Sequence, residues 1–471
     1  MALKKKKFNK NYRRWNDYFA PSEKDGIRLS PTLTVAPDSG SLKNGNVLYI
    51  GDRLADVQII PNLKSGYPDA SLVITDKNYH VYKNTRDALA EDYRIVLIDL
   101  VEPRNSMKYN PLTIAESEIE FTSLARSIVK NSDDSPVNKD YEIFFLASFM
   151  ALVGNHGKKF HLGSNLRDVK VLLNLYLDDE SQVIRFFDIL ETEGWYKDED
   201  GNIFEGRPAD ADIEYHMPSG DEGCIRLYRK ATALDISEDV KKECVKQIIS
   251  ELSKFLNAPF NEILRADDAD LSRMWVEKTA VYIEVPEEPD NVTSMLVMMI
   301  YSQTIDHADQ LVRKHAYSSL AHIHLFIEGL EDHYYLPRIK AKLKTTKAAQ
   351  VTYTIAIQNM SIFQTKYDEK ADFVIDSCAT VLYDSSEDDV TLKWVAKKCG
   401  TIPPLFSFMN KTDIPLVKPD DLKKIDKNEV IILAGKEPPY IEPALSPSEK
   451  ATKGEIVVAD NKKKKKGRHR L

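Results

Sequence analysis

The sequence contains few cysteines, and their arrangement points to neither a disulfide framework nor a metal site. Only four occur among 471 residues, and they are irregularly spaced. Disulfide frameworks and zinc sites use paired or closely spaced cysteines, so neither is expected to organise this chain. No signal-peptide pattern precedes them, and we expect a reduced, cytoplasmic chain. The four are Cys224, Cys244, Cys378 and Cys399.

Long hydrophobic runs are also lacking. The most apolar stretch, residues 143–153, has 11 residues, whereas a helix that crosses a bilayer needs about 20. The sequence therefore predicts no membrane-spanning helix. Peripheral contact with the inner face of the cell membrane stays open, because such contact needs only exposed basic side chains.

Charge of one sign does not dominate the whole chain. The net charge is -8, with 42% apolar and 29% charged residues, which is ordinary for a globular protein with a large core. This balance excludes a protein that coats nucleic acid with its whole surface. Positive charge is instead concentrated at the two ends of the chain, which are expected either to contact nucleic acid or an anionic membrane or to be merely solvated. The basic residues are Lys4, Lys5, Lys6, Lys7, Lys10, Arg13 and Arg14 in an N-terminal arm, and Lys462, Lys463, Lys464, Lys465, Lys466, Arg468 and Arg470 in a C-terminal tail.

Two histidines raise the question of a metal site. His322 and His324 alternate along one predicted strand and therefore share a face, and His333 follows. No carboxylate or cysteine stands at a spacing typical of metal ligands. We therefore expect no metal.

Seven short runs of aliphatic and β-branched residues predict buried strands. Continuous apolar strands of this kind suit a parallel sheet that is covered on both faces. Helical periodicity appears between some of them, at 292–313 and 337–347, which completes a β–α–β pattern and predicts an α/β fold. The predicted strands are 46–50, 71–75, 94–100, 279–285, 323–327, 351–357 and 429–434.

A long helical segment interrupts this pattern. Residues 113–278 have almost no strand signal and repeat apolar residues at helical spacing, so we expect an inserted all-α domain. Its polar middle, 196–223, is expected to be a long loop, and 440–471 is expected to be a mobile tail. The predicted organisation is a basic arm at 1–44, a discontinuous α/β domain at 45–112 and 279–435, the inserted domain at 113–278 and a flexible basic tail at 436–471.

Three passages in order resemble the TraG-type coupling proteins of conjugative type IV secretion. The first joins S-L-V-I-T-D-K-N-Y-H at 71–80 to I-V-L-I-D-L and Y-N-P-L within 95–112. The second runs from L-S-R-M-W at 271–275 through M-M-I-Y-S-Q at 298–303, and the third from I-H-L-F-I-E-G at 323–329 to E-V-I-I-L at 429–433. The resemblance covers about 45–435. It implies a RecA-like, P-loop-type sheet interrupted by an all-α domain, a ring oligomer, and work with DNA and other transfer proteins, such as an active coupling ATPase, a relaxase or an accessory protein.

The phosphate-binding loop of that family is missing here. In the family the first strand opens a G-x-x-x-x-G-K-[ST] loop, whose amides hold phosphates, whose lysine neutralises charge and whose hydroxyl binds Mg²⁺. Here Gly51 remains but Asp52-Arg53-Leu54-Ala55-Asp56 follows. Each of the two carboxylates would repel the phosphates by about 1 kcal/mol or more at contact. We therefore expect ATP to bind poorly or not at all, and no cofactor unless an atypical site holds Mg-ATP.

The other nucleotide motifs that the resemblance implies are degenerate too. Glu328-Gly329 stands where the family has Asp-Glu, so a carboxylate for Mg²⁺ remains but the residue that activates water is lost. Asp76 lies where the family has T-D-P-K-G-E, and 344–347 offers lysine in place of arginine. Gln358 matches a glutamine that senses the γ-phosphate, but we expect a structural role for it.

The leading hypothesis is a coupling-protein-like subunit or adaptor that has lost ATP hydrolysis and binds transfer partners and DNA. One alternative is an active DNA-transfer ATPase that uses Glu328 for metal and Lys64 or Lys77 for phosphate, which predicts nucleotide-dependent thermal stabilisation. The other is a nucleic-acid-binding module that acts through the basic ends, which predicts salt-sensitive binding lost on trimming them.

Overall fold

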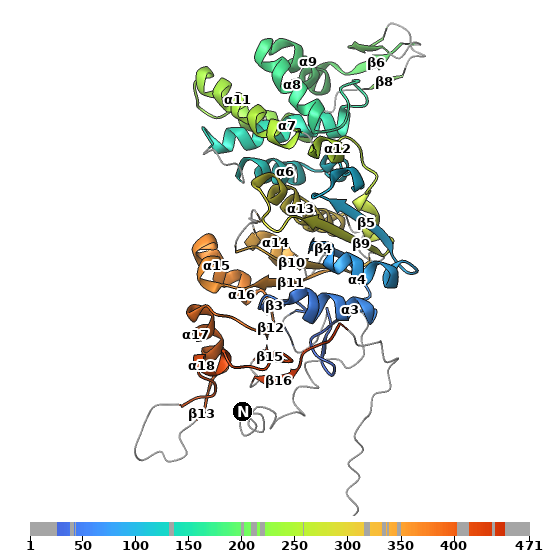
Figure 1. The fold of residues 1–471 in the computed structure, drawn as a ribbon. Coiled ribbons are helices and arrows are strands. Elements are labelled where there is room, and N and C mark those ends of the chain that lie inside the picture. Colours follow the sequence, from blue (N-terminus) through green and yellow to red (C-terminus); the bar gives the residue numbers. More distant parts are fainter. Residues whose placement is uncertain are drawn as a thin grey trace, which may run out of the picture.

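The structure is a computed structural model of the chain. It describes residues 26–37, 42, 44–130, 136–198, 202–208, 214–216, 222–257, 259–314, 321–331, 336, 339–345, 350–402, 414–435 and 439–447. The described part is elongated: helices inserted between two strands lie at the top, a large sheet with helices on both faces occupies the middle, and β15 and β16 lie at the bottom (Figure 1).

Nine strands form the central sheet, in the order β16-β15-β12-β3-β11-β10-β4-β9-β5. The seven from β12 to β5 are parallel, whereas β15 is antiparallel to both its neighbours. All seven predicted strands are confirmed, and β12 and β16 are additional. The strands are β3 Val47–Ile50, β4 Ser71–Lys77, β5 Arg94–Asp99, β9 Thr279–Val285, β10 Ile323–Ile327, β11 Val351–Ile357, β12 Thr380–Tyr383, β15 Glu429–Ala434 and β16 Tyr440–Pro443.

The alternation of side chains along these strands divides the core into two layers. On β3, Val47 and Tyr49 pack with one apolar cluster, while Leu48 and Ile50 pack with the other. Successive side chains of a strand point to opposite faces of the sheet, so a continuous apolar run places apolar side chains in both core layers. The first face carries η2 Ala55–Ile59, α3 Ile60–Lys64 and α4 His80–Leu89; the second carries α13 Asn291–Arg313, α14 Ile339–Thr345, α15 Met360–Tyr367, α16 Glu369–Asp376 and α17 Asp389–Lys398.

Helices dominate the segment between β5 and β9. α7 is buried along nearly its whole length, from Tyr141 to Val153, and forms the centre of this bundle. Asn138 starts it by accepting a hydrogen bond from the Tyr141 amide, as N-cap residues do. The helices are α5 Pro111–Ile114, α6 Glu118–Lys130, α7 Lys139–His156, α8 Leu166–Asp178, α9 Ser181–Asp188, η4 Ile189–Glu193, α10 Gly223–Thr232, α11 Glu238–Phe255, α12 Phe260–Leu264 and η5 Leu271–Trp275.

The expectation of a structureless loop at 196–223 is wrong in part, and the insertion is not purely α-helical. β6 Trp195–Lys197, β7 Ile203–Glu205 and β8 Tyr215–His216 form a three-stranded antiparallel sheet. Strands of two or three residues are too short to show periodicity in a sequence. Stacked rings hold this sheet together, with centroids 3.9 Å apart for Trp195 and His216.

The expected boundaries of the basic arm and the tail also need correction. β1 Ile27–Arg28 pairs with β2 Thr34–Val35 inside the arm, and β16 lies inside the tail. The two segments stabilise each other, because Glu442 of β16 accepts hydrogen bonds from Ser30 and Thr32 at 3.2 and 2.7 Å. The remaining described elements are η3 Pro103–Asn105, β13 Thr401–Ile402, β14 Ile414–Pro415 and α18 Pro419–Leu422. Among the described helices, none has the length and apolar character that crossing a bilayer requires.

Candidate nucleotide-binding site

The carboxyl ends of the parallel strands meet at one edge of the sheet, where ligands of α/β proteins bind. A polar or glycine residue lies at the end of five neighbouring strands. They are Asp384 after β12, Gly51 after β3, Gln358 after β11, Glu328 after β10 and Asp76 near the end of β4. In this row Gly51 lies between Asp384 and Gln358.

The connection after β3 is short and closely packed. Only Gly51, Asp52 and Arg53 separate the strand from the first helical residue, Leu54. The Gly51 amide donates to the Ile357 carbonyl at 3.1 Å, so this group is already paired. A Cβ atom at Gly51 would lie 2.9 Å from Cβ of Asp384, so only glycine fits beside that aspartate.

An internal ion pair fills the place beside this turn. Arg53 donates from Nε to Oδ2 of Asp384 at 3.0 Å and also contacts that carboxylate through Nη2. The Tyr49 hydroxyl donates to the same Oδ2 at 2.7 Å, and Asp384 is buried. Burial, followed by the neighbouring Asp384 carboxylate, raises the pKa of Tyr49 well above its ordinary value, so the phenol keeps its proton. Arg53, the single cationic residue of this turn, is therefore paired with a protein carboxylate.

The two aspartates near this turn, Asp52 and Asp56, are exposed. Asp52 accepts a hydrogen bond from Ser385 at 3.1 Å. Asp56 lies in the first turn of η2 and pairs with His80 Nε2 at 2.8 Å. Negative charge thus lies where the helix N-terminus would otherwise attract phosphate.

Asp76 has a local structural task. Its two oxygens accept hydrogen bonds from the amides of Val81 and Tyr82, at 2.9 and 2.8 Å, in the first turn of α4. Burial raises the pKa of Asp76, and these hydrogen bonds oppose the rise. The carboxylate therefore serves the start of α4.

Glu328 and Gly329 follow β10. Glu328 is partly buried, and burial raises its pKa, while Lys77 at the end of the adjacent strand opposes the rise. Gly329 has φ 77°, a left-handed conformation that disfavours residues with a side chain. Backbone geometry thus accounts for a glycine at this position.

Gln358 is fixed through its main chain. Its amide donates to Oε1 of Glu331 at 2.7 Å, and its carbonyl accepts from Ser386 at 3.2 Å. Its side chain is exposed. The turn after β11 is therefore held in place without using the glutamine side chain.

The remaining expectations concern lysines, histidines and the basic ends. Lys64 lies in the last turn of α3, where its Nζ donates to the Pro447 carbonyl at 3.3 Å.

His324 hydrogen-bonds Thr352 and Thr354 at 2.8 and 3.0 Å, and burial lowers its pKa well below the ordinary value. Within the described ranges, no group of three or more His, Cys, Asp or Glu is arranged to hold a metal ion. All basic residues predicted to contact nucleic acid or membrane, from Lys4 to Arg14 and from Lys462 to Arg470, lie outside the described residues, as does His333.

The sequence analysis missed Tyr49 and Asp384. Asp384 is the last residue of T-V-L-Y-D, an apolar run followed by a carboxylate. The apolar runs of β4 and β5 are likewise followed by an aspartate. This signal was present, but the strand it ends was not among those predicted.

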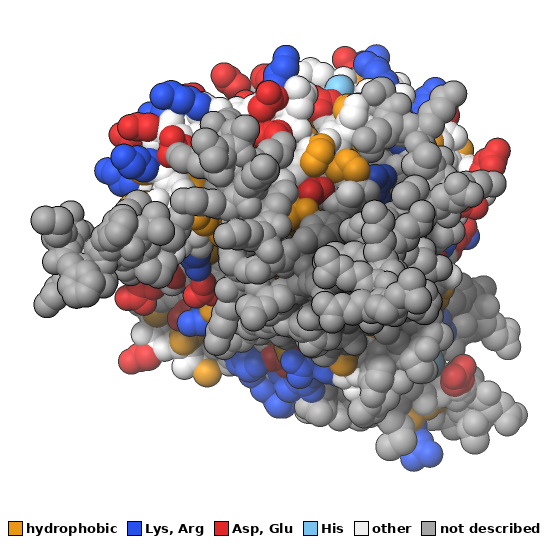
Figure 2. Space-filling view, turned by 90° about the horizontal axis from the view of Figure 1, so that it is seen from below, with side chains coloured by type: hydrophobic (Ala, Val, Ile, Leu, Met, Phe, Trp, Pro, Cys, Tyr) orange, Lys and Arg blue, Asp and Glu red, His pale blue; other side chains and the backbone are white. Residues whose placement is uncertain are grey.

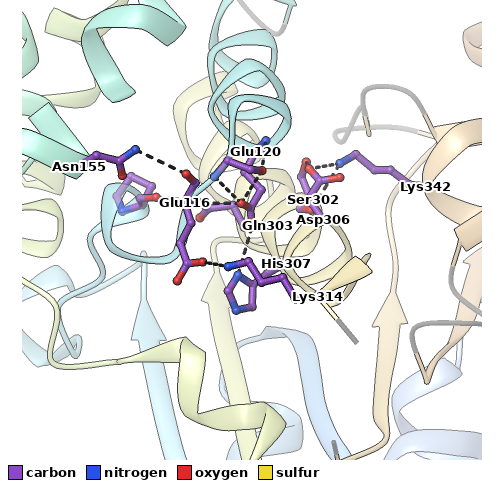
Figure 3. Close-up of polar contacts among 11 residues, drawn as sticks. Glu116, Glu120, Asn155, Ser302, Gln303, Asp306, His307, Lys314 and Lys342 are labelled. Carbon is purple, nitrogen blue, oxygen red and sulfur yellow. Dashed lines mark hydrogen bonds and ion pairs between the residues drawn. The ribbon is translucent and has the colours of Figure 1, made fainter. Parts of the chain in front are cut away.

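A second polar cluster joins the inserted helices to the sheet domain (Figure 3). Glu120 of α6 accepts from His307 of α13 at 3.1 Å, and Lys342 of α14 contacts Asp306 of α13 at 2.5 Å. Lys342 also donates to Ser123 of α6 at 3.1 Å. Burial acts to raise the pKa of Glu120, but hydrogen bonds from His307 and the turn at Ser117 outweigh it and lower the pKa. The cluster ties the inserted helices firmly to the sheet.

Comparison with known proteins gives consistent results. A family model described as "Type IV secretory system Conjugative DNA transfer" matches residues 57–403. The bacterial conjugative coupling protein TrwB, in a trigonal form with sulphate, aligns with TM-score 0.56 and 12% identity over 91% of this chain and 92% of its own. TrwB with the GTP analogue GDPNP aligns with TM-score 0.54 and 14% identity over 87% of each chain. VirB4 of Thermoanaerobacter pseudethanolicus aligns with TM-score 0.51 and 12% identity over 90% of this chain and 97% of its own. No curated protein sequence matches significantly. At these identities the structural matches establish a shared RecA-like fold.

Proposed function

Because the chain belongs to the family of type IV secretory system conjugative DNA transfer proteins, we propose that it is a coupling-protein-like subunit or adaptor that does not hydrolyse ATP. It acts by binding other transfer proteins and DNA. The observation that carries this proposal is the Arg53–Asp384 ion pair beside Gly51, at the place where a P-loop would hold phosphates.

Phosphate binding by this fold needs free amides at a helix N-terminus and an uncompensated cation. Here the turn has three residues, Arg53 is neutralised by Asp384, and Asp52 and Asp56 add negative charge. A triphosphate would have to displace a buried ion pair and then face its carboxylate. TrwB has been solved with a GTP analogue, and we propose that this chain has lost the corresponding capacity.

The geometry disfavours the active-ATPase alternative. The helical segment from Leu54 to Lys64 is about 15 Å long, so Lys64 lies a helix length away from Gly51 and donates to Pro447 instead. Lys77 lies near Glu328, on the far side of β11 and β10 from Gly51. Burial raises the pKa of Glu328, which weakens it as a ligand for Mg²⁺.

The partners we propose are an active coupling ATPase, a relaxase or an accessory protein of the same transfer system. The connection between the two parts of the chain supports an adaptor role, because the buried cluster around Glu120 and Lys342 links the inserted helices to the sheet domain. A partner that binds the helices would therefore be held at a defined distance from one that binds the sheet domain.

A nucleotide test of the full chain decides between adaptor and ATPase. We expect Mg-ATP to leave the thermal midpoint unchanged and ATP turnover to stay at background, since a ligand stabilises a protein only if it binds the folded state. ATP turnover that disappears with Glu328→Gln would overturn the proposal.

A pull-down from cells that carry the whole mobile element tests the partners. Recovery of a full-length ring ATPase or a relaxase by the full chain is expected. Recovery should persist after residues 1–14 and 462–471 are trimmed. Binding that is confined to nucleic acid and lost on trimming would favour the nucleic-acid module instead.

A further inference from the structure

Three aromatic side chains share one face of the small sheet in the inserted segment. In the middle strand β6, Tyr196 is directly opposite Phe204 of β7 and Tyr215 of β8. Residues that are directly opposite on paired strands point to the same face of a sheet. Tyr196, Phe204 and Tyr215 therefore form a row across all three strands, which we call the aromatic face.

The other face of this sheet packs on the inserted helices. Trp195 precedes Tyr196 and so points the opposite way; it is buried, and its ring centroid lies 5.7 Å from that of Phe160. Phe160 in turn lies 5.5 Å from Phe186 of α9. The aromatic face is therefore turned away from these rings, and Phe204 is 43% exposed on it. Figure 1 draws β6 and β8 at the end of the molecule farthest from β15 and β16.

The aromatic face is open at one end. Tyr196 and Phe204 are stacked, with ring centroids 5.4 Å apart and planes 19° apart. A Cβ atom at Gly194 would lie 2.5 Å from the Tyr215 hydroxyl oxygen, so the Tyr215 side chain lies across this glycine. A Cβ atom at Gly206, by contrast, would meet nothing within 4 Å. A ligand can therefore approach the row of rings from the Gly206 side.

The segment that carries the aromatic face is strongly acidic. Residues 196–223 contain nine Asp and Glu against two Lys and Arg, which gives a net charge of -7. Two of the described carboxylates adjoin the strand ends. Asp198 follows β6 and accepts hydrogen bonds from the amide and the side chain of Asn202 at 2.8 and 2.9 Å, and Glu214, just before β8, is exposed. Such a segment attracts cations and repels polyanions.

Charge is distributed differently at the opposite end of the molecule. Figure 2 shows that end from below, and around its rim Lys and Arg side chains lie beside Asp and Glu. An excess of acidic residues next to exposed rings thus distinguishes the inserted sheet from the rim seen in this view.

Aromatic rings attract cations, and arginine makes this contact more often than lysine. The sheet already has such a contact on its other face, where Nζ of Lys197 lies 5.9 Å from the ring centroid of Trp195. Three strands about 4.8 Å apart are crossed by about three to four residues of an extended chain. A short basic segment would thus place its cations on the rings while the nearby carboxylates balance its remaining charge.

We propose that the aromatic face of the β7-β6-β8 sheet binds an extended, arginine- or lysine-rich segment of a partner protein. The rings take the cationic side chains, and the acidic residues around them attract the segment and repel nucleic acid. This inference rests on the proposed adaptor function for the existence of a protein partner, but not on the state of the nucleotide site.

Fluorescence anisotropy with the full chain tests the proposal. The probe is a labelled peptide of about eight residues in which arginine alternates with serine, and a second peptide has glutamine in place of each arginine. Phe204→Leu removes the ring but keeps an apolar side chain, whereas Phe204→Tyr keeps the ring. Glu214→Gln removes an exposed carboxylate. The matched controls are Ile362→Ala, at a residue of α15 that is 44% exposed, and Glu91→Gln, at an exposed carboxylate of the sheet domain.

We expect the parent chain and Phe204→Tyr to bind the arginine peptide equally, and Phe204→Leu to bind it at least about five-fold more weakly. Glu214→Gln should weaken binding about two-fold in about 0.05 M salt and less in about 0.5 M salt, because salt screens an exposed charge. Both controls should bind like the parent, and equal thermal midpoints would show that the variants fold.

Absence of binding to the arginine peptide would overturn the proposal, as would equal binding of the glutamine peptide. Equal affinities of the parent and Phe204→Leu would mean general attraction to an acidic surface and would also overturn it. An oligo-dT strand that binds the parent but not Phe204→Leu would identify nucleic acid as the ligand instead, and self-association that is lost in Phe204→Leu would identify a second copy of this chain. The nucleotide test and the pull-down do not use this peptide, so failure here is distinguishable from failure of the proposed function.

Discussion

The guanidinium of Arg53, which follows β3, donates to the carboxylate of Asp384, which follows β12, with 3.0 Å between Nε and Oδ2. The two residues are 331 positions apart in the sequence but follow adjacent parallel strands. The pair thus links the turn after β3 to the residue after β12 and holds these two strands together.

The first prediction concerns Asp384→Ala, which leaves Arg53 and the buried Tyr49 hydroxyl without their acceptor. Breaking a buried pair by removing one partner is costly, but Arg53 is about one-third exposed, so we expect a loss of about 2 kcal/mol in the free energy of unfolding. Urea denaturation measures it. Glu387→Ala, an exposed carboxylate three residues away, is the control and should change stability by less than about 0.5 kcal/mol.

A double-mutant cycle with Arg53→Met then isolates the pair. Two residues in direct contact should show a coupling energy of about 1 kcal/mol or more. Strict additivity of the two single changes would contradict the assignment of Arg53 to Asp384.

The second prediction concerns Asp76→Ala, which removes the acceptor of the Val81 and Tyr82 amides. We expect a loss of about 1–2 kcal/mol without any nucleotide, together with faster hydrogen exchange at the start of α4. Asp87→Ala on the exposed side of α4 is the control. If stability changed only when Mg-ATP was present, Asp76 would belong to a nucleotide site after all.

Much of the fold could be predicted because strands buried on both faces must be continuously apolar. β9, β10, β11 and β15 match their predicted runs residue for residue. β12 was missed because its four-residue run is short, and β16 because Glu442 and Pro443 give it the composition of a tail. β16 forms a strand because β15 and the turn after β1 supply its partners, which are tertiary contacts that a local pattern does not display.

The candidate site, like the fold, could be predicted from the sequence only in part. The absence of a Gly-Lys-Ser sequence after Gly51 is a local feature that the sequence alone displays. The ion pair beside Gly51 could not be predicted, since Asp384 lies beside Gly51 only through the pairing of β12 with β3. The role of Asp76 was missed for a related reason, because hydrogen bonds to Val81 and Tyr82 depend on how α4 leaves β4.

The third prediction concerns the buried link between the domains. Lys342→Met keeps most of the side-chain volume but leaves the mostly buried carboxylate of Asp306 without its cationic partner. We expect a loss of about 3 kcal/mol, because an uncompensated buried charge remains. Lys340→Met, an exposed lysine of the same helix, should cost less than about 1 kcal/mol. Adding Asp306→Leu to Lys342→Met should restore part of the loss, and a double variant no more stable than the single one would refute this explanation.

The fourth prediction concerns Glu284, at the end of β9. One of its oxygens accepts a hydrogen bond from the Tyr79 amide at 2.8 Å, while the other is buried without a hydrogen bond. Burial, and then the nearby carboxylates of Asp76 and Asp99, raise its pKa to about 8, and Lys83 opposes the rise. The folded chain thus keeps a proton that the unfolded chain releases near its ordinary pKa of 4.5.

This proton makes stability fall as the pH rises from about 4.5 to about 8, because the folded state binds more protons across that range. Glu284→Gln keeps an acceptor for Tyr79 and removes the titration. Its advantage over the parent chain should therefore grow with pH and reach about 2 kcal/mol or more above pH 8. Urea denaturation at several pH values measures this, with Glu287→Gln, an exposed neighbour, as the control. A difference between Glu284→Gln and the parent that is independent of pH would show that Glu284 is already ionised in the folded chain, and the burial of its carboxylate would then have to be compensated by a cation.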